Sequence, residues 1–133
     1  MVVQVVNHVR DFPHPRPDSG RVDWKTLDFR GNFVVIKHAE DEYSFLAHLL
    51  KKSICVKKGE RVRQGQLIGL CGNSGHLTEP HLHFHIQDRA NFYTSVSLPI
   101  QFVEIVIDQK PVGRSYLKRD QRVSGKLTVN EKA

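Results

Sequence analysis

Three histidines stand on alternate positions in the segment EPHLHFHIQD, residues 79–88. Strict alternation predicts a β-strand, because successive side chains in a strand point to opposite faces of the sheet. The apolar set should face a core and the histidines should share the other face: Leu82, Phe84 and Ile86 against His81, His83 and His85. Neighbours on one face lie roughly 6.5–7 Å apart, so one imidazole could bind a metal while the next reaches a water on it. The alternative is a polar strand face that is merely rich in histidine.

Short strands bounded by glycine or polar residues must position these histidines. MVVQVV (residues 1–6), GNFVVIKH (31–38) and GQLIGL (65–70) have the required composition. Apolar residues also alternate over 43–47 and 101–108, and Gly59 and Gly65 mark two tight turns between strands. Little room is left for helix. The sequence therefore predicts an all-β fold built as a single antiparallel β-sheet domain.

Composition places the chain among soluble globular proteins. With 133 residues it is long enough for one domain and too short to predict two. Hydrophobic residues make up 39% and charged residues 26%, within the usual range for such proteins. No apolar run approaches a membrane span, and the first residues turn polar too early for a signal peptide. We therefore expect neither a membrane span nor an export signal in the chain as written.

The net charge of +6 permits an anionic partner but does not indicate nucleic acid, because Lys and Arg are scattered among acids and not interleaved with aromatics. The stretch 110–126 is locally basic, and a solvated face is a better interpretation of it than a polyanion groove. Cys55 and Cys71 form no C-x-x-C pair, so we expect free thiols in strands and not a zinc ribbon or a redox pair.

Two segments should lie outside the regular sheet. DFPHPRPDSGR (residues 11–21) carries three prolines and predicts an exposed loop, with His14 facing solvent. The residues from Gln109 onward are mostly polar and predict a mobile C-terminus. We accordingly expect a domain over residues 1–108 and a partly ordered C-terminal extension over 109–133.

The order of four segments resembles one enzyme family. GNFVVIKH, YSFLAHL, VKKGERVRQGQLIGLCGNSG and TEPHLHFHIQ follow one another as in the lysostaphin-like (LytM-type) zinc metalloendopeptidases, which cut peptide cross-links of bacterial peptidoglycan. The resemblance runs from about Met1 to Asp88. The element around GQLIG also occurs in lipoyl-type domains and in a sugar phosphotransferase carrier, so the full order carries the resemblance. It implies the duplicated hybrid motif fold of these peptidases, a zinc cofactor and a peptidoglycan peptide as substrate.

The resemblance also implies roles for three histidines. His83 matches the family's zinc ligand, and His81 and His48 match its two catalytic histidines. Zinc lowers the pKa of a bound water to about 7, and a nearby histidine can then take its proton while another stabilises the oxyanion or protonates the leaving amine. The remaining histidines are expected to be structural or lack supporting context: His8, His38, His76 and His85.

A catalytic zinc normally has three protein ligands, and in this family two come from an H-x-x-x-D motif upstream of the first strand. We expect this sequence to lack the motif, because MVVQVV matches the segment that follows it in the family, and His8 with Asp11 is one residue too short to replace it. We therefore expect weak zinc binding. Two explanations stay open: a truncated piece of a longer peptidase of the cell envelope or the secreted fraction, or a degenerate member that binds without cutting. A carrier module of the lipoyl or phosphotransferase type is a third, weaker alternative.

Overall fold

The computed structural model describes residues 1–12 and 22–125 of the chain. It divides into two compact units, Met1–Leu98 and Pro99–Ala133. The predicted loop over residues 11–21, with His14, lies almost wholly outside the described residues.

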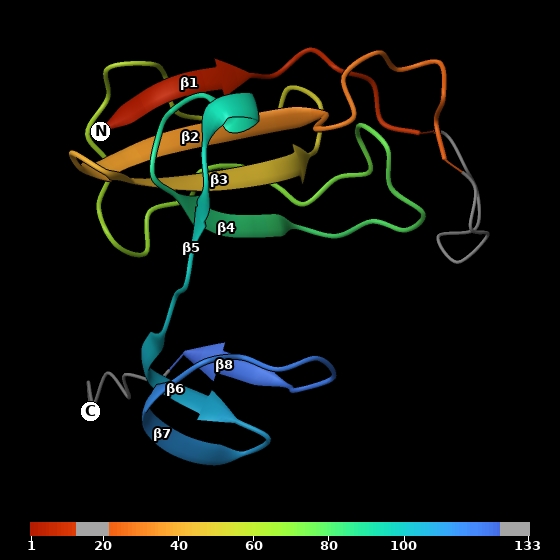
Figure 1. The fold of residues 1–133 in the computed structure, drawn as a ribbon. Coiled ribbons are helices and arrows are strands. Elements are labelled where there is room, and N and C mark those ends of the chain that lie inside the picture. Colours follow the sequence, from red (N-terminus) through yellow and green to blue (C-terminus); the bar gives the residue numbers. More distant parts are fainter. Residues whose placement is uncertain (13–21, 126–133) are drawn as a thin grey trace, which may run out of the picture. The chain divides into compact units, whose positions relative to one another are not determined.

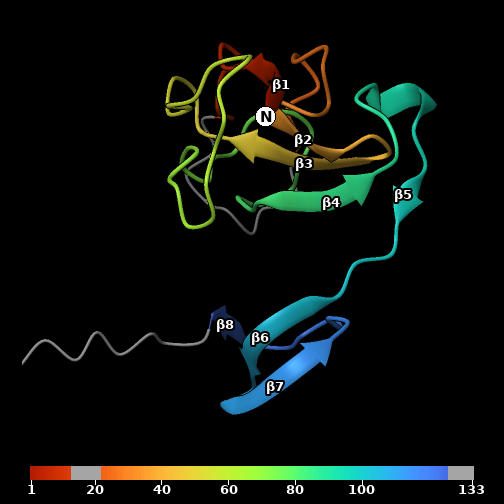
Figure 2. The ribbon, with the colours of Figure 1, turned by 90° about the vertical axis from the view of Figure 1, so that its left-hand side faces the viewer.

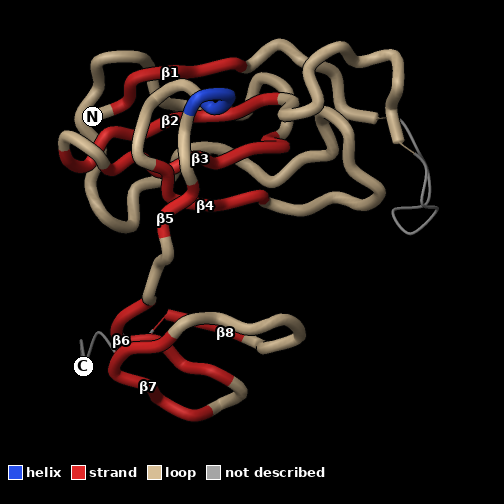
Figure 3. Tube along the Cα trace, in the orientation of Figure 1, coloured by secondary structure: helices blue, strands red, loops and turns tan. Residues whose placement is uncertain are grey.

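The first unit is built on a five-stranded antiparallel sheet with the order β1-β2-β3-β4-β5 (Figure 1). Its strands are β1 (Val2–Val6), β2 (Asn32–Ala39), β3 (Glu42–Leu49), β4 (His83–Gln87) and β5 (Ser97–Leu98). One 3-10 helix, η1 (Phe92–Thr94), is the only helix in the described residues (Figure 3). The all-β antiparallel prediction is confirmed. Figure 2 shows β2, β3 and β4 stacked in order, which brings the histidine strand beside β3.

One side of this sheet, which we call the aliphatic face, is covered by the chain that links β3 to β4. Val34 and Ile36 of β2 are buried there at 0% and 6% exposure. The covering residues come from the linking segment: Ile54, Val56, Val62 and Ile68. Burying such side chains contributes about 1.5–3 kcal/mol each, so this face serves mainly the stability of the sheet.

The other side, which we call the histidine face, carries aromatic rings and imidazoles. Phe33 and Phe45 are buried and stack with ring centroids 5.2 Å apart. His85 pairs with Phe45 across the strands, and His83 pairs with Ala47. The prediction that alternate histidines share a face is therefore supported by the register for these two.

The predicted burial of the apolar set on β4 is only partly right. Leu82 is 48% exposed and Phe84 39% exposed, while Ile86 is half-buried. The aliphatic cluster gathers on β1, β2 and the end of β3 and does not include these residues. Alternation predicted which side they face, but it could not predict how far the covering segment reaches.

The predicted strand over residues 65–70 is wrong. This stretch follows a turn at Gly65 and forms no regular strand. Its backbone groups make single hydrogen bonds to another irregular stretch, from Cys55 N to Ile68 O and from Leu50 N to Leu70 O. Both cysteines are exposed free thiols, as expected, but neither lies in a strand.

The second unit is a three-stranded antiparallel sheet with the order β7-β6-β8. Its strands are β6 (Phe102–Ile107), β7 (Lys110–Ser115) and β8 (Val123–Gly125). Asp108 and Gln109 form the turn between β6 and β7 with φ values of 48° and 69°, as a two-residue hairpin of the primed type requires. The strand predicted at 101–108 is confirmed, but it pairs with residues beyond Gln109 that were expected to be mobile. Residues 126–133 lie outside the described part.

No helix among the described residues is long and apolar enough to cross a membrane.

Candidate functional site

A β-bulge positions His48. The register between β2 and β3 shifts between Asn32 and Val34, so Ala47 and His48 together lie opposite one residue of β2. His48 has a φ of 63°, which is uncommon for a residue other than glycine. Bulges re-aim side chains, and here the His48 ring centroid lies 4.9 Å from that of His81. Strict alternation would have placed His48 on the aliphatic face.

The Ser74 carbonyl fixes the protonation of the His48 ring. His48 Nδ1 lies 2.9 Å from Ser74 O. Because a carbonyl oxygen can only accept, Nδ1 carries the hydrogen and the neutral ring keeps its lone pair on Nε2. Burial lowers the pKa of His48; the hydrogen bond to Ser74 opposes this shift, and the charge of His81 adds to it. At neutral pH His48 is therefore a neutral imidazole with an unprotonated Nε2.

A buried polar network holds Ser74 in place. Its hydroxyl accepts from Asn32 N at 2.9 Å and donates to Leu49 O at 2.7 Å. The Asn32 amide donates to Val9 O at 2.7 Å and to Leu49 O at 3.0 Å, and accepts from Val9 N at 2.7 Å. Gly31, with φ of 66°, lies so close that an added Cβ would overlap the Ser74 carbonyl. Glycine at position 31 therefore permits the approach that orients His48.

His81 and His83 complete a group of three imidazoles. His81 Nδ1 lies 3.0 Å from Glu79 O, so it carries the hydrogen and leaves Nε2 free. The His83 ring centroid lies 6.1 Å from that of His48. Partial loss of surrounding water lowers the pKa of His83, and the charges of the neighbouring histidines lower it further. His48 and His83 thus favour the neutral form, which can accept a proton or bind a metal.

Aromatic side chains and one arginine wall this group. A small pocket of about 50 Å³ opens beside the imidazoles, and its lining residues are Phe29, Arg30, Phe45, Ala47, His48, His83 and Phe92. Phe29 and Phe92 meet edge to face with centroids 5.4 Å apart. The walls of this pocket are largely apolar, and of the three imidazoles only His48 is buried.

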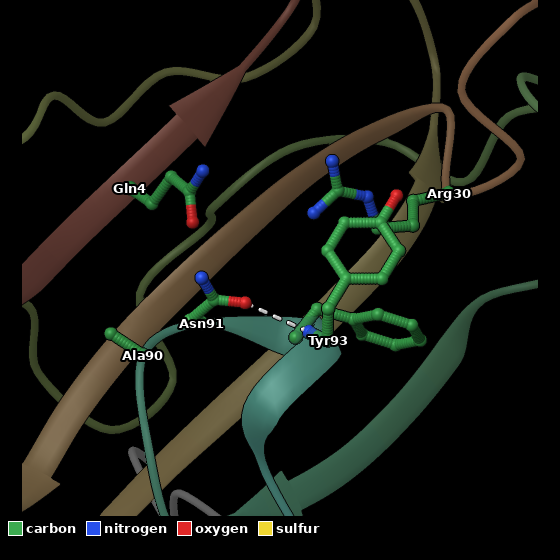
Figure 4. Close-up of a pocket in the computed structure, with 6 residues that line it drawn as sticks. Gln4, Arg30, Ala90, Asn91 and Tyr93 are labelled. Carbon is green, nitrogen blue, oxygen red and sulfur yellow. Dashed lines mark hydrogen bonds between the residues drawn. The ribbon is translucent and has the colours of Figure 1, made fainter.

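Arg30 joins this pocket to a larger one. Its guanidinium binds Asp28 in two places, at 2.9 and 2.7 Å, which raises the pKa of Arg30 and lowers that of Asp28. It also lies 4.5 Å from the centroid of Phe33 and 5.0 Å from that of Tyr93. The larger pocket measures about 330 Å³ and is lined by Gln4, Arg30, Ala90, Asn91, Phe92 and Tyr93 (Figure 4). In Figure 4 the amides of Gln4 and Asn91 lie opposite each other beside Arg30.

Comparisons with known proteins identify the family of the chain. The model of Peptidase family M23 matches residues 17–94, more than half of the chain. The chain belongs to peptidase family M23. The peptidoglycan DD-endopeptidase ShyA of Vibrio cholerae is 48% identical over 58 residues, which cover 44% of this chain and 13% of ShyA. ShyB of the same organism is 34% identical over 104 residues, 78% of this chain and 19% of ShyB.

The chain thus spans less than a fifth of the length of these two relatives. One solved structure, a mutant of the catalytic domain of the prophage-encoded M23 protein EnpA from Enterococcus faecalis, shares 24% identity. The match covers 71% of this chain and 87% of that one, with a TM-score of 0.47. At this distance it supports no statement about single residues.

The M23 family is generally zinc-dependent. The imidazoles are of the kind that binds zinc, but the described residues offer too few ligands for a complete site. Zinc prefers neutral imidazole, which His48 and His83 provide. However, within residues 1–12 and 22–125 no group of three His, Cys, Asp or Glu side chains is arranged to hold a metal ion. The described residues therefore do not form a complete zinc site.

Asp11 has a structural role that makes it a poor substitute ligand. Its carboxylate accepts from the backbone N–H groups of Asn73 at 2.9 Å and Lys51 at 3.0 Å. The expectation that the sequence lacks the H-x-x-x-D motif is wrong as regards spacing, because this spacing occurs once after the first strand, at His14 and Asp18. Both residues lie outside the described part of the chain.

Sequence reasoning also missed the residues that surround the imidazoles. Arg30, Phe92 and Tyr93 belong to segments with no periodic pattern, so only the folded chain brings them to the histidine face. His85 was set aside, yet it lies in line with His83 and Gln87 on β4. His38 was expected to be structural, and its Nε2 lies 2.8 Å from Ser44 Oγ, away from the three imidazoles.

Proposed function

We propose that this chain is the peptidase part of an M23 enzyme that hydrolyses peptide bonds in bacterial peptidoglycan, outside the cytoplasm. The convergence of His48, His81 and His83 beside an aromatic-walled pocket carries the proposal. The DD-endopeptidase relatives, ShyA and ShyB, support peptidoglycan as the substrate class.

The proposed roles follow from the free ring nitrogens. We assign His48 and His81 to proton transfer, because each is fixed through Nδ1 and keeps Nε2 available. One of them can take a proton from the attacking water at Nε2 and then donate that proton to the leaving amine, and such catalysis contributes about 10²- to 10⁴-fold. We assign His83 to the metal. A zinc cofactor is part of the proposal and needs ligands beyond the described residues.

Substitution separates these roles. We expect His83→Ala to abolish zinc binding by the purified chain. His81→Ala should leave zinc binding intact and reduce hydrolysis of purified peptidoglycan by about 10²- to 10⁴-fold. Zinc is measured by titration against a competing chelator, and hydrolysis by the appearance of new amino groups. His38→Ala serves as the control, because the His38 ring lies 2.8 Å from Ser44 Oγ and is not one of the three converging imidazoles. Full activity in His81→Ala would show that its role is misassigned.

A second function is favoured by the incomplete metal site. A chain that lacks a three-residue metal cluster in its described part could bind peptidoglycan without cutting it. This alternative predicts sedimentation with purified peptidoglycan, no release of amino groups, and no effect of zinc on either. A carrier module predicts instead a stable phosphohistidine after incubation with a phosphoryl donor, which we do not expect.

A further inference from the structure

Gln87 ends a chain of hydrogen bonds that starts at His83. His83 Nε2 lies 2.8 Å from His85 Nδ1, and His85 Nε2 lies 2.8 Å from Gln87 Oε1. The amide nitrogen of Gln87 donates to Arg89 O at 2.7 Å and lies 3.5 Å from Ala90 O. Every second residue of β4 thus contributes one link, because all three side chains point to the same face of the strand.

The backbone carbonyls set the direction of the whole chain. A carbonyl oxygen can only accept, so the Gln87 nitrogen must face Arg89 and the Gln87 oxygen must face His85. His85 must then carry its hydrogen on Nε2, which leaves Nδ1 as an acceptor. His83 must in turn carry its hydrogen on Nε2 and keep its lone pair on Nδ1. Reversing the direction would place the Gln87 oxygen against Arg89 O, with no hydrogen between them.

Burial makes this direction costly to reverse. Gln87 is fully buried, at 0% exposure. His85 lies between two aromatic rings, with centroids 5.1 Å from Phe45 and 6.0 Å from Phe92. A buried polar group without a partner costs about 1–3 kcal/mol, so reversing the Gln87 amide is costly, although the His83 end of the chain is exposed. The hydrogen-bond direction that is fixed at Arg89 O therefore determines which ring nitrogen of His83 carries the hydrogen.

We propose that His85 and Gln87 are positioning residues that hold His83 as the Nε2–H tautomer, with Nδ1 free to bind a metal ion. Outer hydrogen-bond acceptors of this kind fix the tautomer and ring orientation of metal-binding histidines. The statement that His83 binds a metal rests on the proposed function, whereas the statement about its tautomer does not. Neither residue touches the substrate; both act through His83.

The test uses the metal-free chain labelled with ¹⁵N at histidine. Long-range ¹H–¹⁵N spectra at pH 7.5 should show His83 with a protonated, slowly exchanging Nε2 and an unprotonated Nδ1. His85→Leu removes the acceptor, so the His83 Nε2–H should exchange rapidly. His85→Glu restores an acceptor and should restore slow exchange. His38→Leu, on the same sheet, should leave the His83 signals unchanged. Zinc affinity should fall about 10- to 100-fold in His85→Leu and recover in His85→Glu.

Two results would overturn the inference. One is a wild-type spectrum with the His83 proton on Nδ1, which needs no variant and stands even if His85→Leu fails to fold. The other is a slowly exchanging His83 Nε2–H in folded His85→Leu. If the wild-type chain shows the expected tautomer but binds no zinc, the positioning inference holds and the proposed zinc chemistry fails.

Discussion

The two faces of the five-stranded sheet differ in how their side chains are held. The aliphatic face is closed by apolar residues from the β3–β4 segment, and its packing depends on volume. On the histidine face the imidazoles have directed hydrogen bonds: His48 to Ser74 O, His81 to Glu79 O, and His83 to His85 along β4. The aliphatic face can therefore tolerate the exchange of one apolar side chain for another of similar volume. On the histidine face the orientation of each ring depends on individual hydrogen-bonding atoms. The aliphatic face thus mainly stabilises the sheet and the histidine face mainly positions the candidate site. The buried aromatic rings and the Asn32 hydrogen bonds contribute to both.

The largest effect should come from a ring that serves both purposes. Phe45 is 1% exposed and contacts Phe33, Phe92 and His85 with centroids 5.1–5.2 Å away. Phe45→Ala should lower the free energy of unfolding by about 3–5 kcal/mol, because it leaves a cavity in the centre of the sheet. Urea unfolding followed by circular dichroism measures this. A change within about 0.5 kcal/mol, as for an ordinary surface substitution, would contradict it.

Asn32 links the two faces, and its removal should be the next most costly change. Asn32→Ala takes away three hydrogen bonds to Val9 and Leu49 in a fully buried position. Each group left without a partner costs roughly 1–3 kcal/mol, and Ser74 still satisfies Leu49 O. We expect a loss of about 2–3 kcal/mol in the free energy of unfolding, measured by urea unfolding. Asn7→Ala is the matched control, because the Asn7 bonds are longer, at 3.3 and 3.5 Å, and it should lose much less.

A small substitution on the aliphatic face should lower stability slightly without affecting the histidine face. Ile36→Val removes one methylene from a residue that is 6% exposed and should cost about 0.5–1.5 kcal/mol. The ¹⁵N signals of His48, His81 and His83 should not change. Altered histidine signals at this modest cost would show that the two faces are coupled through packing, and the separation drawn between them would be wrong.

Local patterns predicted much of this sheet. Alternation identified β1, β2, β3, β4 and β6, and the order of motifs predicted the family. The irregular parts were not predictable in this way. GQLIGL has the composition of a strand, yet its backbone bonds to an irregular stretch and not to a regular partner. Composition describes a segment, whereas a strand also requires a neighbour.

The site shows the same limit more sharply. Alternation put His83 and His85 on one face, which the register supports. It could not predict that a bulge with a positive φ turns His48 toward them, because the cause lies in the pairing of β2 with β3. Nor could it predict Arg30, which reaches the histidine face from a turn, or Phe92, which reaches it from η1. His85 seemed dispensable because its role depends on Gln87 and a backbone carbonyl, neither of which a metal-binding motif includes.

The smallest expected effect is a dependence of stability on pH that comes from the histidine face alone. The folded-state pKa values of His48 and His83 are lowered, mainly by burial, from an ordinary value of 6.5. The unfolded chain therefore binds more protons as the pH falls below that value. Their contribution to stability is complete above pH 6.5 and is lost as the pH falls through the folded pKa values. The urea midpoint should accordingly decrease between pH 8 and pH 5.5, a range above the titration of Asp23 and Asp28, whose pKa values are also lowered. The double variant His48→Gln, His83→Gln should flatten this decrease and His38→Gln should not. An equal slope in all three proteins would mean that these imidazoles are hydrated more fully than their positions indicate.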